Sequence, residues 1–312
     1  MSDGATPIIR NAGGLLQRYD VLFCDVWGVV HDGHLALGPA ADALIRFRQA
    51  GGTVILVSNA PVPNHQVARM LLERQLSRQA WDAIVSSGDI ALRHITQSGI
   101  RKLFAIGPQD RDAALFEKAG TLTSKLELAD AVLCSGLNDD IRETAEDYRA
   151  LLLEAKNQAL PFVCANPDLV VDVGGTLYLC AGALGDLYQE IGGEVFWAGK
   201  PYDVAYQTAL EQAEVLRGAP VDRSRLLVVG DSVRTDLTGA EKFGVDALFI
   251  AGGIHRDEAV IDGDICHIRL GEVLTFNAPP AIAAMPYYCL LYTSDAADDM
   301  YKVFLCVGGG EG

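Results

Sequence analysis

Residues 21–30 read Val21-Leu22-Phe23-Cys24-Asp25-Val26-Trp27-Gly28-Val29-Val30, and this stretch indicates the fold of the chain. An apolar run ends in a carboxylate at Asp25, and Gly28 follows three residues later. A buried parallel strand delivers a polar side chain in this way to the C-terminal edge of a sheet, where open α/β proteins bind their ligands. The stretch therefore predicts a buried strand that carries a functional carboxylate at its end.

The rest of the chain alternates between short apolar runs and amphipathic stretches, which is typical of a parallel sheet with helices on its faces. The predicted strands cover 21–25, 53–58, 102–106, 131–134, 161–165, 194–198, 226–230 and 247–250. The predicted helices cover 40–50, 64–79, 177–191 and 202–213. No internal repeat or low-complexity linker divides the sequence, so the domain boundaries have to follow from the motifs.

Length and charge limit the classes of function. The chain has 312 residues, half of them hydrophobic, which is enough for a large core and about two domains. Its net charge of −16 argues against nucleic acid and against an anionic membrane surface as partners. Seven scattered cysteines without a C-x-x-C pair are typical of reduced thiols, and no stretch is long and apolar enough to span a bilayer. We therefore expect a cytoplasmic protein.

The C-terminal segment 289–312 differs in character from the rest of the chain. Its first part, Cys289-Leu290-Leu291-Tyr292-Thr293-Ser294-Asp295-Ala296-Ala297-Asp298-Asp299, looks like a translated adapter from sequencing-library preparation. We interpret 289–312 as a non-native tail and leave it out of the fold; an ordinary acidic tail is the alternative. Without it four acidic residues and one basic residue are lost, so the net charge stays strongly negative.

Three further segments resemble parts of a phosphate site. Leu56-Val57-Ser58-Asn59 is an apolar strand that ends in a hydroxyl and an amide, and Gly199-Lys200-Pro201 places one cation in a loop. Leu226 to Asp236 contains another apolar strand, followed by the carboxylates of Asp231 and Asp236. Each segment alone is weak evidence, but in this order, each at the end of a strand or in a loop, they form a strong combination.

In these four segments the chain resembles the haloacid dehalogenase (HAD) superfamily, and specifically its class IIA branch of nucleotide, p-nitrophenyl phosphate and pyridoxal phosphate phosphatases. The resemblance covers about residues 19–270 and includes Asn166-Pro167-Asp168 and Gly182-Ala183 ahead of the lysine loop. It implies an α/β fold: a Rossmann-like, parallel-sheet HAD core made of 1–79 and 197–288, with an inserted α/β cap domain at 80–196. The oligomeric state is open, although in related proteins the cap often carries the contact of a homodimer.

The resemblance also implies roles for individual residues. Asp25 would attack phosphorus and form an aspartyl phosphate, while Lys200 would neutralise the charge shared by Asp25 and the phosphoryl group. Ser58 and the Asn59 backbone would bind phosphoryl oxygens. Asp25, Asp231 and the backbone carbonyl of Trp27 would bind Mg²⁺, and Asp236 would orient Lys200 or support the metal ligands.

Each of these residues also has a simpler interpretation. Asp25 can end a strand without a catalytic role, and Ser58 can form a hydrogen bond within its own turn. Lys200 can be a solvated surface residue. Asp236 fits a helix N-cap. The Asn166-Pro167-Asp168 and Asp32-Gly33 segments are favourable turns in any protein, and His31 fits a structural role in the second of them.

Trp27 is the departure from the family pattern. Two residues after the nucleophile the active phosphatases usually carry a second Asp, which protonates the leaving group and then activates water; such help is worth about 10²–10⁴-fold in rate. An indole N–H only donates hydrogen bonds and does not titrate usefully. Good leaving groups such as aryl or acyl phosphates would suffer least from this loss, and His31 could substitute as the acid, although a structural role suits it better.

Three functions remain compatible with the sequence. The first, which we favour, is a Mg²⁺-dependent phosphatase of small phosphorylated metabolites. The second is a catalytically weakened protein of the same fold that binds a phospho-ligand or has a regulatory role. The third is a dehalogenase-type hydrolase, since superfamily dehalogenases carry an aromatic residue at the position of Trp27. Asp231 argues against the third, because a metal-free site has little use for that carboxylate.

Overall fold

The computed structural model describes residues 6–173, 176–275 and 277–289. The expected non-native tail therefore lies outside the described residues, apart from Cys289. Cys289 is tied to the N-terminal segment, because its carbonyl oxygen accepts a hydrogen bond from the Ala12 amide at 3.1 Å.

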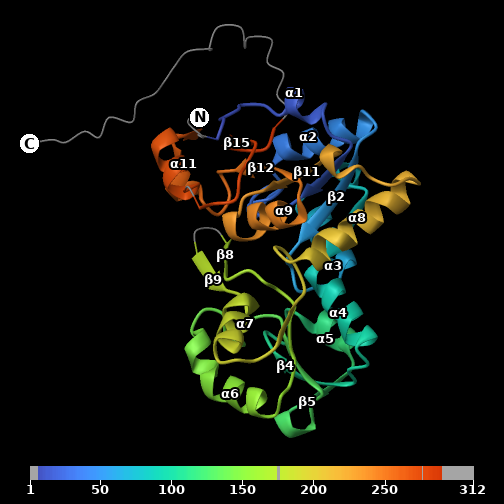
Figure 1. The fold of residues 1–312 in the computed structure, drawn as a ribbon, viewed down its shortest axis with the longest axis vertical. Coiled ribbons are helices and arrows are strands. Elements are labelled where there is room, and N and C mark those ends of the chain that lie inside the picture. The colour runs from blue at the N-terminus through green and yellow to red at the C-terminus, as the bar shows by residue number, and fades with distance from the viewer. Residues whose placement is uncertain (1–5, 174–175, 276, 290–312) are drawn as a thin grey trace, which may run out of the picture.

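The first of two layered units is built on a six-stranded sheet of order β15-β12-β11-β1-β2-β3, in which every neighbouring pair is parallel (Figure 1). Its strands are β1 (Val21–Cys24), β2 (Thr53–Ser58), β3 (Ala83–Ser86), β11 (Leu226–Gly230), β12 (Asp246–Ile250) and β15 (Ala283–Met285). Side chains alternate between the two faces: Val21 and Phe23 join one hydrophobic cluster, and Leu22 and Cys24 join the other. Both faces are therefore buried, which explains the continuous apolar runs in the sequence.

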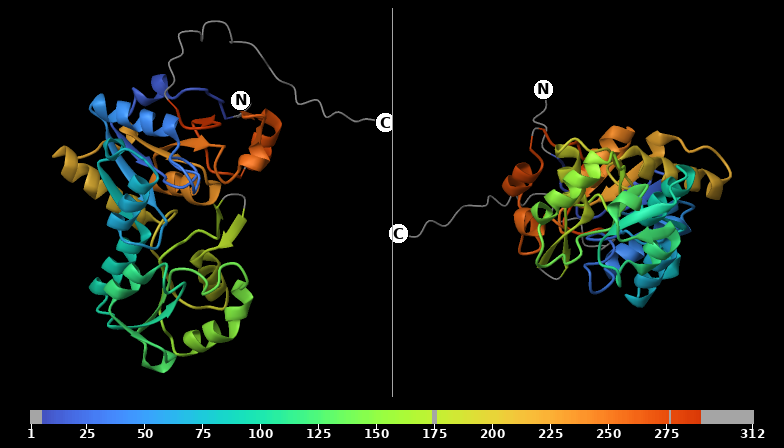
Figure 2. Two further views of the ribbon diagram at one scale, coloured as in Figure 1. Left: turned by 180° about the vertical axis from the view of Figure 1, so that it is seen from behind. Right: turned by 90° about the horizontal axis from the view of Figure 1, so that it is seen from below.

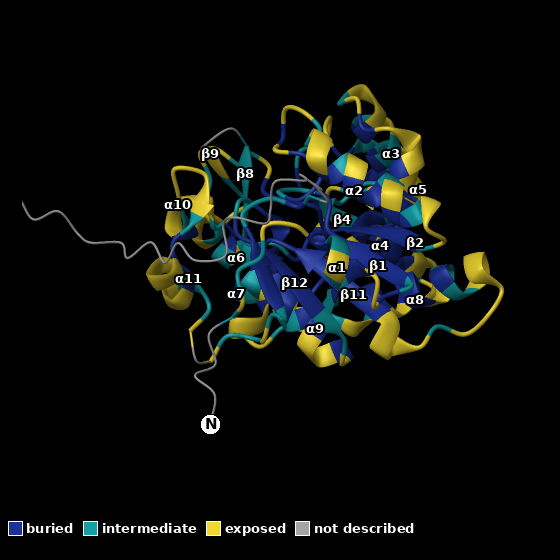
Figure 3. Ribbon diagram, turned by 90° about the horizontal axis from the view of Figure 1, so that it is seen from above, coloured by how far each residue is buried: buried dark blue, intermediate teal, exposed yellow. Residues whose placement is uncertain are grey.

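Helices cover both faces of this sheet, and seen from above the strands form a buried layer between exposed helical surfaces (Figure 3). One face is packed by α2 (Gly38–Gln49) and α3 (Asn64–Glu73). The other is packed by α8 (Asp203–Arg217) and α9 (Thr238–Phe243). Short peripheral elements complete this unit: α1 (Gly13–Leu16), α10 (Arg256–Ala259), α11 (His267–Val273) and the hairpin of β13 (Val260–Ile261) and β14 (Asp264–Ile265).

The second unit, which we call the cap, has a five-stranded parallel sheet of order β10-β7-β6-β4-β5 (Figure 2, left). Its strands are β4 (Lys102–Ile106), β5 (Thr121–Thr123), β6 (Ala131–Cys134), β7 (Phe162–Cys164) and β10 (Val195–Trp197). Its helices are α5 (Ala113–Ala119), α6 (Arg149–Asn157) and α7 (Ala181–Glu190), while α4 (Ser87–Gln97) leads into it from the core. An antiparallel hairpin of β8 (Val170–Val173) and β9 (Thr176–Leu179) projects from the cap toward the core (Figure 1).

The carboxyl edge of the cap sheet faces the carboxyl edge of the core sheet. The chain leaving β10 passes through Lys200, whose side chain reaches Asp25 at the end of β1. The chain leaving β7 passes through Asp168, whose carboxylate accepts a hydrogen bond from Asn59 after β2. One hydrophobic cluster contains residues of both sheets, so the two units share a continuous apolar contact. The cleft-forming edges of both sheets therefore meet at one place.

The expected fold class is confirmed, and most predicted strands begin and end within one residue of the observed ones. Three predicted helices are wrong in extent. The helix predicted at 202–213 continues as α8 to Arg217. The helix predicted at 64–79 ends at Glu73, because Gln75 adopts a left-handed conformation with φ 66°. The helix predicted at 177–191 begins only at Ala181, because 176–179 pairs with β8 as a strand.

The domain division stays a prediction, but strand pairing shifts its edges. β3 pairs in parallel with β2, so the core sheet extends past the expected boundary at residue 80 to Ser86. At the other end Trp197 still pairs with Cys164 of the cap sheet. β3 was not predicted from the sequence, since its four residues, Ala-Ile-Val-Ser, contain only two large apolar side chains before the polar Ser86.

Gly182 in the first turn of α7 lets the helix approach the Asn166-Pro167-Asp168 turn. A β-carbon there would lie 2.4 Å from the carbonyl oxygens of Pro167 and Asp168. We therefore expect Gly182→Ala to destabilise the protein by about 1–3 kcal/mol, measured by denaturant unfolding. The matched control is Gly38→Ala in the first turn of α2, where a β-carbon meets nothing within 4 Å and no loss is expected. Equal stability of the two variants would contradict the close approach.

Candidate active site

Asp25 lies at the carboxyl end of β1, in the middle of the core sheet. Its amide donates to the Val229 carbonyl at 2.8 Å and so prolongs the pairing of β1 with β11 by one residue. The side chain is buried, with 9% of the residue exposed. The backbone pairing therefore fixes where this carboxylate can lie.

Lys200 reaches Asp25 from the loop after the cap strand β10. Its Nζ lies 2.5 Å from Asp25 Oδ1 and 2.8 Å from Asp236 Oδ1, and only 2% of the residue is exposed. Burial by itself lowers the pKa of the Lys200 ammonium, but the carboxylates of Asp236 and Asp25 outweigh burial and hold that pKa well above its usual value. The cation is therefore permanently charged and bridges the two acids.

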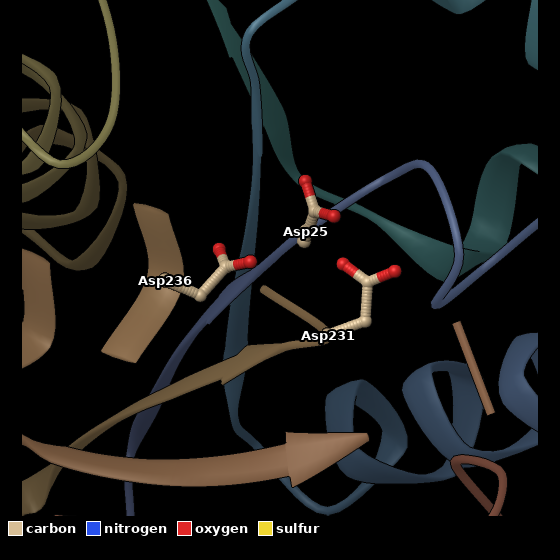
Figure 4. A group of neighbouring side chains, drawn as sticks. All are labelled: Asp25, Asp231 and Asp236. Atoms are coloured by element: carbon tan, nitrogen blue, oxygen red, sulfur yellow. The ribbon is translucent and has the colours of Figure 1, made fainter. Parts of the chain in front are cut away.

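Asp231 follows β11 and completes a group of three carboxylates with Asp25 and Asp236 (Figure 4). One carboxylate oxygen of each lies within 4.8 Å of the others. Asp231 Oδ2 accepts from the Ile254 amide at 2.7 Å. Two glycines enclose the same oxygen, since a β-carbon at Gly28 or Gly253 would come within 2.0 or 1.9 Å of it. Gly28 also has φ 77°, which explains why the loop after the nucleophile needs a glycine there.

When all three are ionised, Asp25, Asp231 and Asp236 carry more negative charge than Lys200 can balance. Burial raises the pKa of Asp25 to about 7, against the opposing effect of Lys200. Burial, followed by the charges of Asp25 and Asp236, raises the pKa of Asp231 well above its usual value. A site that offers only oxygen ligands and holds excess buried negative charge is chemically suited to a hard divalent cation. The Trp27 carbonyl oxygen fits the same purpose, because no donor of the described residues hydrogen-bonds to it.

Asn59 holds the lysine loop in place with its side chain. Its Oδ1 accepts from the Lys200 amide at 2.8 Å and from the Ser87 hydroxyl at 3.3 Å. Its Nδ2 donates to the Lys200 carbonyl at 3.1 Å and to Asp168 Oδ1 at 2.9 Å. The side chain of Asn59 is thus engaged in positioning Lys200, which leaves its backbone for the expected contact with phosphate.

Several simpler interpretations can now be decided. Lys200 is buried, so the surface interpretation is wrong. Asp236 is not an N-cap: Ser232 caps that turn, and Asp236 Oδ2 accepts from the Ser232 amide at 3.2 Å. Ser58 Oγ does accept from the amide of Ala60 at 3.2 Å, so the turn role of Ser58 is confirmed and its contact with phosphate stays a prediction.

The loop after Trp27 forms the expected turn. Asp32 Oδ1 accepts from the amides of His34 and Leu35, both at 2.9 Å. His31 is fully buried, and its Nδ1 accepts from the Gly33 amide at 2.9 Å. Burial lowers the pKa of His31 to about 4, so the imidazole is neutral near pH 7. These contacts support the structural role for His31.

Asp168 was only weakly indicated by the sequence, and the contacts that join the cap to the core were not predicted. Asp168 lies beside Asn59, and burial raises the pKa of its carboxyl. The Trp27 indole donates to the Asp172 carbonyl of β8 at 2.8 Å. Arg234 pairs with Asp186 of α7 at 3.0 Å. The Asn166-Pro167-Asp168 segment was the one feature that could have indicated Asp168; the other contacts join positions far apart in the chain.

Comparison with known proteins places this site in a family. Residues 22–121 match the family described as haloacid dehalogenase-like hydrolase, and residues 197–268 match a family described as HAD-hydrolase-like. A crystal structure of a haloacid dehalogenase-like hydrolase from Brucella suis 1330 is 40% identical, with a TM-score of 0.78, and the match covers 90% of this chain and all of that one.

Two further relatives are more distant. The 5'-nucleotidase YutF of Bacillus subtilis (strain 168) is 25% identical over 250 residues, which are 79% of this chain and 93% of that protein. The p-nitrophenyl phosphatase of Archaeoglobus fulgidus is 18% identical with a TM-score of 0.65, over 86% of this chain and 96% of that one, and so shares the fold. The expected superfamily, with the core and cap of its class IIA branch, is confirmed. In the described part of the chain, no helix combines the length and apolar character needed to cross a membrane.

The buried ammonium of Lys200 generates a stability prediction. In Lys200→Met the carboxylates of Asp25 and Asp236 lose their counterion, and we expect a loss of about 3–5 kcal/mol in unfolding free energy at pH 8. The loss should shrink toward pH 5. A carboxyl group whose pKa is raised by folding contributes to the stability of the folded protein below its unfolded-state pKa. This contribution is lost as the pH rises through its folded-state pKa.

The measurement is denaturant unfolding at the two pH values, with Lys102→Met as the control. Lys102 is exposed on β4, so its replacement should stay within about 0.5 kcal/mol of wild type. A Lys200→Met protein as stable as wild type at pH 8 would show that the two acids do not depend on this cation.

Proposed function

Because this chain belongs to the haloacid dehalogenase-like hydrolases, we propose that it is a phosphatase of small phosphorylated metabolites that works through Asp25. The observation that carries the proposal is the Lys200 ammonium, buried between Asp25 and Asp236 and next to Asp231. A carboxylate that attacks a phosphate dianion meets repulsion between like charges, and this arrangement supplies a fixed cation at the point of attack. Two of the relatives are named for the hydrolysis of phosphate monoesters, which supports the reaction class.

The first step is attack by a carboxylate oxygen of Asp25 on phosphorus. A new bond forms between that oxygen and phosphorus, the ester P–O bond breaks, and its electron pair leaves with the departing oxygen. Lys200 holds Asp25 Oδ1 at 2.5 Å and thereby orients the carboxylate. Asp236 keeps Lys200 in place, and Asn59 holds the backbone on which Lys200 is carried. Ser58 and the Asn59 amide are the proposed donors to the phosphoryl oxygens.

In the second step water attacks the aspartyl phosphate at phosphorus. The bond between phosphorus and the Asp25 oxygen breaks, inorganic phosphate leaves, and the carboxylate of Asp25 is restored. The proton of the water passes to solvent or to a base in the cleft. The Lys200 ammonium lies next to Asp25 Oδ1, where it stabilises the carboxylate as it is released.

Asp25, Asp231 and the carbonyl oxygen of Trp27 are the proposed ligands of Mg²⁺. When bound, the ion would neutralise charge on the phosphoryl group and add fixed oxygen ligands around it. The residues fit such an ion, since the carboxylates of Asp25, Asp231 and Asp236 converge and burial raises the pKa of both Asp25 and Asp231. Mg²⁺ keeps several waters in most protein sites, so few protein ligands suffice.

The proposed partner is a small phosphorylated molecule rather than nucleic acid, because a chain of net charge −16 repels a polyanion. The cysteines Cys24, Cys134, Cys164 and Cys180 are free and buried. Free thiols are typical of a reducing compartment such as the cytoplasm, which we propose as the location.

A phospho-ligand-binding protein is the second candidate, and Trp27 is the observation that favours it. An indole next to the nucleophile cannot donate or accept the proton of the leaving group. The dehalogenase alternative has less support, because a reaction without a metal does not require the carboxylate of Asp231, which is buried between Gly28 and Gly253.

The two candidates are separated by phosphate release from p-nitrophenyl phosphate, acetyl phosphate and nucleoside monophosphates, with Mg²⁺ or with EDTA. We expect Mg²⁺-dependent turnover that falls by more than about a thousandfold in Asp25→Asn, because the nucleophile is removed. Asp42→Asn on the exposed surface of α2 is the control and should match wild type. Binding of these compounds without any turnover would instead support the phospho-ligand-binding protein.

The metal site is tested without activity, by thermal unfolding with and without Mg²⁺. Wild type should be stabilised by Mg²⁺, by about 2.7 kcal/mol when the ion is at a hundred times its dissociation constant. Asp231→Asn should lose this response. At pH 8 without metal it should also be more stable than wild type, because it removes a buried charge of raised pKa. A full response of Asp231→Asn to Mg²⁺ would place the ion elsewhere.

A further inference from the structure

Trp27 joins the loop after the nucleophile to the cap. Its Nε1–H donates to the carbonyl oxygen of Asp172 at 2.8 Å, across 145 positions of sequence. Asp172 belongs to β8, the strand of the cap hairpin that projects toward the core in Figures 1 and 2. The contact uses the single polar atom of the indole.

Two more contacts fix the indole ring. The indole and the buried ring of His31 form a T-shaped contact, with 4.5 Å between the centroids and 69° between the planes. Gly33 also lies against the indole, since a β-carbon there would come within 3.1 Å of the Trp27 ring and 3.6 Å of Val173 Cγ1. The glycine therefore leaves room for the indole and the hairpin to meet. Trp27 thus has a built position between the core loop and β8.

The same loop provides no proton donor for a leaving group. His31 is fully buried, and its Nδ1 accepts a hydrogen bond from the Gly33 amide. The carboxylate of Asp32 accepts from two amides of its own turn. The position two residues after Asp25 is taken by an indole that is engaged with the cap. On the cap side Asp168 is a nearby acid, and its Oδ1 accepts from Asn59.

We propose that Trp27 is a specificity-determining residue: it fastens the β8–β9 hairpin to the nucleophile loop and restricts the enzyme to phosphates whose leaving group departs without a proton. The inference rests on the proposed phosphatase function. When the ester P–O bond breaks, the electron pair stays on the departing oxygen, so a basic alkoxide leaves slowly unless it is protonated. Carboxylates and acidic phenols or enols leave as stable anions. The substrate class is therefore acyl, aryl or enol phosphates rather than alkyl phosphates.

The experiment measures kcat/KM for acetyl phosphate, a series of substituted phenyl phosphates and glycerol phosphate. Wild type should show a steep dependence on leaving-group pKa, with glycerol phosphate at least about a hundredfold slower than p-nitrophenyl phosphate. In Trp27→Asp a carboxyl group replaces the indole. The ratio of kcat/KM for p-nitrophenyl phosphate to kcat/KM for glycerol phosphate should then decrease by at least about tenfold. Trp81→Phe, a buried tryptophan packed in the core away from the site, should keep the wild-type dependence.

Hydrogen exchange of residues 170–173 and 176–179 tests the contact with the cap directly. Trp27→Phe keeps the ring and removes the N–H, so exchange in this hairpin should become faster while the steep leaving-group dependence is kept. Unchanged exchange in Trp27→Phe would overturn the fastening role.

The outcomes separate this inference from the proposed function. Rapid hydrolysis of both aryl and alkyl phosphates by wild type would overturn the specificity and keep the phosphatase. In that case Asp168→Asn would show whether the cap supplies the acid, by a selective loss on glycerol phosphate. Failure of wild type to hydrolyse any of the compounds would contradict both the phosphatase and its specificity.

Discussion

The buried ion pair of Lys200 with Asp25 and Asp236 is the interaction on which the arrangement of the whole site depends. Asp25 at the end of β1 and Asp236 in the helical turn after β11 repel each other in a buried setting, and the cation of Lys200, from the loop after the cap strand β10, holds them together. Breaking such a buried pair by removing one partner is strongly destabilising, because it leaves an uncompensated charge. The position of the cap, the conformation of the lysine loop and the state of the nucleophile are therefore linked through one ammonium group.

Asn59 extends this link in both directions. Its amide oxygen and nitrogen hold the backbone of Lys200 on both sides, and its nitrogen also binds the cap residue Asp168. Trp27 forms a second connection, from the residue two beyond the nucleophile to the backbone of the hairpin. These two contacts anchor the cap to the core, together with Lys200 and the ion pair of Arg234 with Asp186. We expect the substrate to be recognised in the space between these anchors, where the carboxyl edges of two parallel sheets face each other.

Local features of the sequence were enough to predict the strand ends and the residues gathered there. Asp25 and Asp231 each follow a buried apolar run, and the parallel pairing of β1 with β11 brings them together. The end of α3 could not be predicted, because it depends on a left-handed Gln75 that no composition rule favours. β9 was read as helix because four residues, Thr-Leu-Tyr-Leu, became a strand only by pairing with β8. The contact of Trp27 with the cap depends on tertiary packing, so a pattern of neighbouring residues cannot reveal it.

The central claim is that Asp25 becomes phosphorylated during turnover, and it can be tested by trapping the enzyme within a single turnover. Wild type would be mixed with a slight deficit of ³²P-labelled p-nitrophenyl phosphate and Mg²⁺, quenched in acid and digested for peptide mapping. The account predicts a transient label on the peptide that contains Asp25, which disappears as inorganic phosphate is released. Release of phosphate with no labelled peptide at any time, or a label on a peptide without Asp25, would contradict it.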